Sequence, residues 1–216
     1  MNKLAIFDLD GTILDTIYDL NQALCYTLAE FNLSKISVEE TKANLGRGIR
    51  NLIKTSAKLD ECPDNMFNTF MSYYNNNVNN YTKPYDGINE LLINLKNRGY
   101  KLAVISNKNI KPLSLLIESH FKNIFDLVLG EGMGFPKKPN PDIVLYCINK
   151  LGSDINNTIY IGDSDIDIQT VKNVGCNGLY VSYGYRPKEK LIETGAEIIF
   201  DNVQKLQEYL LNNNCI

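Results

Sequence analysis

Histidine is almost absent from this 216-residue sequence, and closely spaced cysteine pairs are absent altogether. The single histidine, His120, lies in a predicted helical segment, far along the chain from the acidic clusters described below. A Ser-His-Asp triad and a histidine-based zinc site therefore have little support. The cysteines are odd in number and none form a Cys-x-x-Cys pair, which argues against a disulfide framework. We expect reduced, mostly buried side chains at Cys25, Cys62, Cys147, Cys176 and Cys215.

Long apolar runs and long basic runs are missing as well. No apolar stretch approaches the roughly 20 residues that span a bilayer. The short apolar run after Lys3 is interrupted by Asp8 and Asp10, so it makes a poor signal peptide. We expect a cytoplasmic protein with no membrane partner. The formal net charge is -3, and because no basic residues cluster, nucleic acid is not expected as a partner.

The sequence does contain short apolar runs that alternate with helix-length segments. The runs are continuous rather than alternating in polarity, which is typical of strands buried on both faces of a parallel sheet. Several helical patterns end at a glycine, a favoured residue just after a helix. This alternation predicts an α/β fold with a parallel sheet flanked by helices. The predicted strands cover residues 4–7, 102–105, 127–129, 158–161, 179–181 and 198–200, and the clearest helices 88–98, 141–151 and 165–174.

One segment departs from this alternation and contains helical patterns alone. Between Thr16 and Tyr81, apolar residues recur at helical spacing and no strand pattern is found. The segment ends at the turn-forming sequence of residues 83–87, a plausible hinge. We therefore predict two domains, a core made of residues 1–15 and 82–216 and a helical domain made of residues 16–81.

Polar clusters follow three of the predicted strands. Residues 8–12 (Asp-Leu-Asp-Gly-Thr), 106–108 (Ser-Asn-Lys) and 162–167 (Gly-Asp-Ser-Asp-Ile-Asp) each come directly after an apolar run. Ligand sites of open parallel sheets form beyond the carboxyl ends of the strands. We expect the three clusters to converge on one crevice that holds carboxylates, a hydroxyl and an ammonium group.

These residue types favour carboxylate chemistry beside a metal ion. Oxygen ligands without histidine or cysteine point to Mg²⁺. A carboxylate can attack phosphorus to form an aspartyl-phosphate, and Mg²⁺ and a lysine offset the charge repulsion. A second carboxylate can exchange protons with the leaving oxygen and with water. Asp8 and Asp10 are two residues apart and point to the same side of an extended segment.

The order of these motifs resembles the haloacid dehalogenase (HAD) superfamily. The DxDGT element of residues 8–12 looks like its first motif, and Ser106 looks like its second. Lys138 in the Lys-Pro-Asn-Pro segment is similar to the third motif, and residues 162–167 to the fourth, G-D-x-x-x-D. The resemblance spans nearly the whole chain. It implies a Rossmann-like core, with the helical insert serving as a C1-type cap that closes over the substrate.

The resemblance also implies a role for each matching residue. Asp8 would be the nucleophile and a Mg²⁺ ligand, and Asp10 the general acid/base and a ligand through its backbone carbonyl. Asp163 would be the third ligand, and Asp167 would orient metal-bound water or the lysine. Asp165 is interpreted as the N-cap of the following helix.

Further residues are expected to hold the phosphate. We favour Lys138 over its neighbour Lys137 on motif spacing. In the cap, Arg47 and Arg50 are interpreted either as contacts to an anionic substrate or as solvated helix charges. The predicted phosphate-binding residues are Gly11, Thr12, Ser106, Asn107 and Lys138.

The subfamily resemblance is to phosphoglycolate phosphatase-like proteins. It is carried by residues 106–108, by the cap segment 46–52 (Gly-Arg-Gly-Ile-Arg-Asn-Leu), by 85–87 (Tyr-Asp-Gly) and by the late loop 182–185. The implied substrate is a small phosphorylated metabolite, acted on by a monomer or homodimer.

Other activities of the same core remain open. A phosphomutase of the β-phosphoglucomutase type, a pyrophosphatase and a nucleotidase would use the same residues. Dehalogenases replace the second aspartate of the first motif, so Asp10 speaks against that branch. Phospho-accepting receiver domains are shorter and lack a helical insert of this size.

Overall fold

A six-stranded parallel sheet forms the centre of the larger part of the molecule. The computed structural model describes residues 1–212. The strands run in the order β5-β4-β1-β6-β7-β8, and β1 pairs in parallel with β4 on one side and β6 on the other. The strands are β1 (Leu4–Phe7), β4 (Lys101–Asn109), β5 (Leu127–Glu131), β6 (Thr158–Gly162), β7 (Asn177–Val181) and β8 (Ile199–Phe200).

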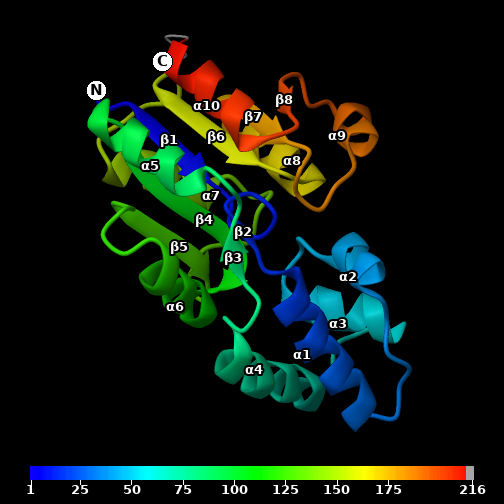
Figure 1. Ribbon diagram of the computed structural model, residues 1–216. Coiled ribbons are helices and arrows are strands. Elements are labelled where there is room, and N and C mark those ends of the chain that lie inside the picture. Colours follow the sequence, from blue (N-terminus) through cyan, green and yellow to red (C-terminus); the bar gives the residue numbers. More distant parts are fainter. Residues whose placement is uncertain (213–216) are drawn as a thin grey trace.

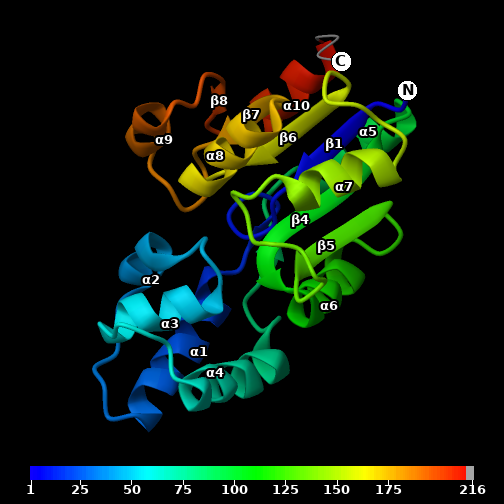
Figure 2. The same ribbon diagram turned by 180° about the vertical axis from the view of Figure 1, so that it is seen from behind.

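Helices cover both faces of this sheet. Side chains of a strand alternate between its faces, so Ala5 and Phe7 of β1 join one apolar core, whereas Leu4 and Ile6 join another. Figures 1 and 2 show the two faces, with one set of helices in front of the sheet in each view. The first face carries α5 (Ile88–Asn97), α6 (Ile110–His120) and α10 (Val203–Asn212), and the second carries α7 (Asp142–Lys150), α8 (Asp165–Val174) and α9 (Lys188–Thr194).

Four further helices form a separate layer beyond the sheet. In Figure 1 they lie past the ends toward which β1 and β6 point. The chain enters this helical insert through β2 (Leu14–Asp15) and leaves it through β3 (Lys83–Pro84), and these two short strands pair antiparallel. The insert consists of α1 (Ile17–Glu30), α2 (Val38–Asn44), α3 (Ile49–Ala57) and α4 (Asp64–Asn77).

A buried carboxylate ties the two connections of the insert together. Asp19, near the start of α1, is almost completely buried. It accepts hydrogen bonds from the backbone amides of Tyr81 and Thr82, at 3.1 and 2.9 Å, and from the Thr82 hydroxyl at 2.7 Å. A buried carboxylate needs such partners. The entry and exit segments are therefore held side by side.

Most of the predicted architecture is confirmed. All six predicted strands lie in the sheet, and the segment 16–81 contains only helices and their connections. The pair β2 and β3 was not predicted, because two-residue strands leave no periodic signal. The domain boundaries at 15/16 and 81/82 and the C1 assignment of the cap stay predictions.

The expectation of mostly buried cysteines is wrong for the part of the chain that the structure covers. Cys147 is buried, whereas Cys25, Cys62 and Cys176 are half-buried and all four are free thiols. Cys215 lies outside the described residues. Within residues 1–212, no helix combines the length and apolar character needed to cross a membrane.

Candidate active site

The three polar clusters meet at one edge of the sheet. Asp8 follows β1, Ser106 lies in the last part of β4, and Asp163 follows β6. All three line a cavity between the sheet and the helical insert, which contributes Leu45, Gly46, Gly48 and Ile49. The convergence predicted from the sequence is therefore confirmed, and the insert covers it.

Lys138 joins two of the carboxylates. Its ammonium lies 2.9 Å from Asp8 Oδ1 and 2.8 Å from Asp167 Oδ1. It also donates to the Tyr160 hydroxyl at 2.7 Å, and that hydroxyl donates to Asp167 Oδ1 at 3.0 Å. Burial alone would lower the pKa of Lys138, but Asp167 and Asp8 raise it well above its ordinary value. The lysine therefore remains a cation next to Asp8.

Asp167 is held by its own helix as well as by the lysine. Its Oδ2 accepts from the backbone amide of Ser164 at 3.1 Å and from the Ser164 hydroxyl at 2.6 Å. The two residues form a capping box at the start of α8. The prediction that Asp165 caps this helix is wrong, because Ser164 occupies the N-cap position and its hydroxyl reaches the free amide of Asp167.

Asp10 contacts a different set of residues. Its Oδ1 accepts from the Thr16 hydroxyl at 2.6 Å and lies 2.9 Å from the Lys108 ammonium. The Lys108 side chain is 1% exposed and that of Asp10 is 14% exposed. Asp8 and Asp10 thus face the same cavity, but each has its own lysine.

Asp163 is fixed by the loop after β7. Its Oδ2 accepts from the backbone amide of Tyr185 at 2.7 Å, and its Oδ1 accepts from the Thr12 hydroxyl at 3.3 Å. Gly11 passes beside it with φ of +89°, and a Cβ there would overlap the Asp163 carboxylate. A side chain at residue 11 would therefore displace Asp163 as well as strain the backbone.

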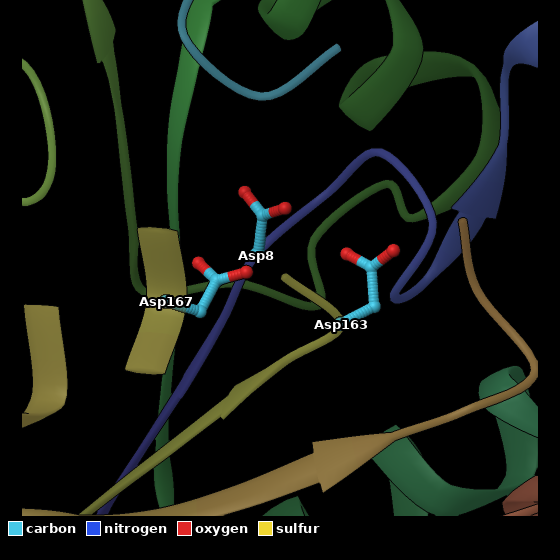
Figure 3. A group of neighbouring side chains, drawn as sticks. All are labelled: Asp8, Asp163 and Asp167. Carbon is cyan, nitrogen blue, oxygen red and sulfur yellow. The ribbon is translucent and has the colours of Figure 1, made fainter. Parts of the chain in front are cut away.

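The buried acids have an arrangement that suits a divalent cation. One carboxylate oxygen each from Asp8, Asp163 and Asp167 lies within 4.8 Å of the others. Figure 3 shows these three side chains, which come from two separate segments of the chain. Desolvation by burial, opposed by Lys138, raises the pKa of Asp8 to about 7. Burial and the charges of Asp167 and Asp8 raise that of Asp163 well above its ordinary value. A cation would offset this repulsion, and an all-oxygen donor set fits a hard ion such as Mg²⁺.

Both oxygens of Asp167 already accept hydrogen bonds, from Lys138 and Tyr160 on one side and from Ser164 on the other. Each Asp167 oxygen accepts two hydrogen bonds within residues 1–212, whereas each Asp163 oxygen accepts one and Asp8 uses only Oδ1. The lone pairs left on Asp8 and Asp163 favour these two acids over Asp167 as direct ligands. The Asp10 carboxylate lies outside the three-acid cluster, which is compatible with a ligand role for its backbone carbonyl only.

The predicted phosphate-binding residues lie around the same cavity, although their surroundings differ. Ser106 is buried and lines it. The Asn107 side chain is fully engaged elsewhere, because it bonds the backbone N–H and C=O of Lys138 at 2.8 and 2.9 Å and donates to Gly46 O at 3.0 Å. Asn107 therefore joins the lysine loop to the insert, and a phosphate contact is left to its backbone amide.

The two cap arginines do not line this cavity. Arg47 lies 3.3 Å from Asp165 at the junction of insert and sheet, and Arg50 lies 2.8 Å from Asp64 on the surface of the insert. Lys137, the alternative to Lys138, pairs with Glu131 at 2.7 Å. The substrate contacts expected of Arg47 and Arg50 stay a prediction, whereas the geometry favours Lys138 over Lys137.

Several residues of the site were missing from the sequence-based set, among them Thr16 and Tyr160, which contact Asp10 and Lys138. Lys108 follows Ser106 on the same strand, so its place in the cluster was the available signal. Tyr185 and Arg186 lie on the loop after β7. The signal for Tyr185 was the subfamily resemblance of residues 182–185, which assigned it no role, and Arg186 lies just beyond that segment. Arg186 donates to the carbonyls of Lys42 and Leu45 at 2.5 and 2.6 Å and so attaches this loop to the end of α2.

Comparisons with known proteins agree with this geometry. A family model for haloacid dehalogenase-like hydrolases matches residues 5–181. The phosphoglycolate phosphatase of Aquifex aeolicus is 35% identical over 185 residues, which cover 85% of this chain and 86% of that protein. The phosphoglycolate phosphatase of Agrobacterium fabrum is 31% identical over 214 residues, covering 95% and 91%.

Solved structures give the same result over nearly the full length. A crystal structure from Lactobacillus delbrueckii subsp. bulgaricus has a TM-score of 0.87 at 35% identity and covers 99% of this chain and 100% of that one. A predicted phosphoglycolate phosphatase from Haemophilus somnus has a TM-score of 0.86 at 27% identity, covering 98% and 97%. The chain belongs to the haloacid dehalogenase-like hydrolases.

Proposed function

We propose that this protein is a Mg²⁺-dependent phosphatase that hydrolyses a small phosphate monoester through an aspartyl-phosphate on Asp8. One observation carries the proposal. Two carboxylates separated by a single residue face one cavity, and Lys138 holds Asp8 while Lys108 and Thr16 hold Asp10. Such separate surroundings suit two different roles, nucleophile and proton carrier.

In the first half-reaction, an Asp8 carboxylate oxygen bonds to phosphorus and the bond from phosphorus to the ester oxygen breaks. Asp10 gives its proton to the departing oxygen, which leaves as an alcohol. In the second half-reaction, Asp10 takes a proton from water, and the water oxygen bonds to the phosphorus. The phosphorus–Asp8 bond breaks, inorganic phosphate leaves, and both aspartates return to their starting forms.

The residues of the cavity support these steps. Lys138 and Ser106 are proposed to bind the phosphoryl oxygens, together with backbone amides near Gly11, Thr12 and Asn107. Asp8, Asp163 and the Asp10 backbone carbonyl would hold the ion. Bound Mg²⁺ would offset the charge of the phosphoryl group beside these acids. Asp167 would keep Lys138 aimed at Asp8.

The best-supported substrate is 2-phosphoglycolate, since curated relatives at 35% and 31% identity are named phosphoglycolate phosphatases. The helical insert, residues 16–81, is proposed to close over it as a cap. A cytoplasmic location and a monomeric or homodimeric state stay predictions.

A phosphate-release screen tests this proposal. The protein with Mg²⁺ is offered short carboxylated esters, phosphosugars, nucleotides and pyrophosphate, each with and without a chelator. We expect chelator-sensitive release of phosphate, greatest from 2-phosphoglycolate. An isomeric phosphosugar without free phosphate would instead indicate the phosphomutase alternative, and activity unaffected by the chelator would contradict the metal requirement.

A further inference from the structure

Three cationic side chains line the cavity, and two of them are already engaged. Lys138 bonds Asp8, Asp167 and Tyr160. Arg186 donates to two backbone carbonyls of the insert and lies 3.4 Å from Asp165. Lys108, by contrast, forms one ion pair, with Asp10. An ammonium group has three donors, so Lys108 has capacity beyond that pair.

The second partner of Lys108 comes from the helical insert. Tyr74, on α4, is fully buried, and the centroid of its ring lies 4.9 Å from the Lys108 ammonium. The Tyr74 hydroxyl lies beside the Lys108 ammonium, but within residues 1–212 no hydrogen bond of normal geometry satisfies it. A buried hydroxyl without a hydrogen bond is unfavourable. A ligand that accepts a hydrogen bond there would remove this cost.

The position of Lys108 relative to Asp10 defines what such a ligand would be. Under the proposed function, Asp10 gives its proton to the ester oxygen of the substrate, so that oxygen lies next to the Asp10 carboxylate. Lys108 bonds the same carboxylate at 2.9 Å. A substrate group near Lys108 is therefore only a few bonds from the ester oxygen. In a glycolyl phosphate, the carboxylate carbon is two bonds from that oxygen.

We propose that the Lys108 ammonium, assisted by the Tyr74 hydroxyl, binds the carboxylate of the substrate and selects short phosphate monoesters that carry one beside the ester oxygen. This inference rests on the proposed function. It assigns the preference for a carboxylate to Lys108 of the sheet and Tyr74 of the insert. A bound substrate carboxylate would therefore link the sheet to the insert.

The test compares two substrates that differ only in this group, 2-phosphoglycolate and 2-hydroxyethyl phosphate. The kcat/KM ratio of the two is measured for the wild type, Lys108→Met, Tyr74→Phe and the control Lys137→Met. Lys137 is a neighbouring lysine paired with Glu131 instead. We expect the ratio to fall about 10- to 100-fold in Lys108→Met, the value of a charged hydrogen bond. We expect a smaller fall in Tyr74→Phe and no change in the control.

Each result has one meaning. Equal losses on both substrates in Lys108→Met would show that the lysine acts only through Asp10 and would overturn the inference, as would a wild type without preference for the carboxylate. If Lys108→Met fails to fold by circular dichroism, Tyr74→Phe decides, since it removes a single oxygen, and an unchanged ratio there overturns the inference. A wild type that hydrolyses no phosphate ester would refute the proposed function itself.

Discussion

At the scale of single residues, Asp8 and Asp10 differ because their neighbours differ. Asp8 is surrounded by other acids and one lysine, whereas Asp10 lies between a hydroxyl and another lysine. The two positions lie two residues apart on one extended segment, so their spacing alone does not distinguish them, and only the family resemblance assigns them different roles. In the structure their surroundings differ because of two lysines far along the chain, Lys138 beside Asp8 and Lys108 beside Asp10.

Replacing the proposed nucleophile gives the first prediction. Asp8→Asn should lower kcat on a chromogenic phosphate ester by at least about 1,000-fold, because the amide cannot form the phosphoryl bond. The fold should persist, since the amide matches the carboxylate in shape. Circular dichroism supplies the control for folding. Near-normal turnover by the folded variant would contradict the proposed role of Asp8.

The raised pKa of Asp8 gives a second prediction, for the metal-free protein. The folded-state value of about 7 exceeds the ordinary value of 3.8. Between these pH values the folded chain keeps a proton that the unfolded chain has lost, so the free energy of unfolding falls as pH rises. The Asp8→Asn variant has no carboxyl group at this position, so its free energy of unfolding does not fall for this reason. Its stability relative to the wild type should rise by roughly 1–4 kcal/mol from pH 4 to pH 7.5.

Urea unfolding in the presence of a chelator measures this difference at several pH values. The comparison between variant and wild type cancels the titration of groups that both proteins share. A stability difference that stays constant with pH, or that shrinks toward pH 7.5, would show that Asp8 is ionised over the whole range.

At the scale of elements, specific hydrogen bonds hold the connections between the sheet and the insert. Asp19 holds the entry to the insert against its exit, and Arg186 attaches the loop after β7 to the end of α2. Carbonyls at a helix C-terminus carry partial negative charge, which suits a guanidinium. These contacts fix the insert over the cavity in the arrangement shown in Figure 1.

The third prediction concerns the Asp19 link. Asp19→Ala should lower the free energy of unfolding by about 2–4 kcal/mol, because it removes a buried charged acceptor and leaves the Tyr81 and Thr82 amides unpaired. The exposed Asp60 on the insert provides a matched control, and Asp60→Ala should change stability by less than about 0.5 kcal/mol. Urea unfolding of both variants checks this. Equal effects at the two positions would mean that the link carries no stability.

At the scale of the whole molecule, the site exists only where three distant chain segments meet. A cation bound there would stabilise the folded state alone, because the unfolded chain does not assemble the acids. Binding to the folded state raises stability with ligand concentration. This linkage provides a test of the metal site that does not depend on activity.

Accordingly, the fourth prediction is a thermal shift with Mg²⁺. At about 100 times the dissociation constant, the gain is about 2.7 kcal/mol, or a rise of roughly 5–10 °C in Tm for a chain of this size. Sodium chloride at the same ionic strength is the control for screening. Asp163→Ala should abolish the Mg²⁺-dependent part. An equal shift in that variant would place the ion elsewhere.

Much of the fold was predictable because its signals are local. Continuous apolar runs marked all six strands of the sheet, and helical spacing without strands marked the insert. The polar residues that end β1, β4 and β6 were predictable as one cluster, since parallel strands bring their carboxyl ends to the same edge. We did not predict β2 and β3, because strands of two residues leave no periodic pattern. We also did not predict the N-cap at Ser164, because the neighbouring Asp165 is an equally suitable capping residue.

The acids, the strands that present them and the helical segment after the first strand can be read from the sequence, because they depend on residue type and on short spacings. The pairs Lys138–Asp8, Lys108–Asp10, Arg47–Asp165 and Arg50–Asp64 became visible only in the folded structure. Such pairings depend on the distances that packing creates between residues far apart in the chain. Tyr74 of α4 and Lys108 of β4 are likewise far apart in the sequence and meet only in the folded chain.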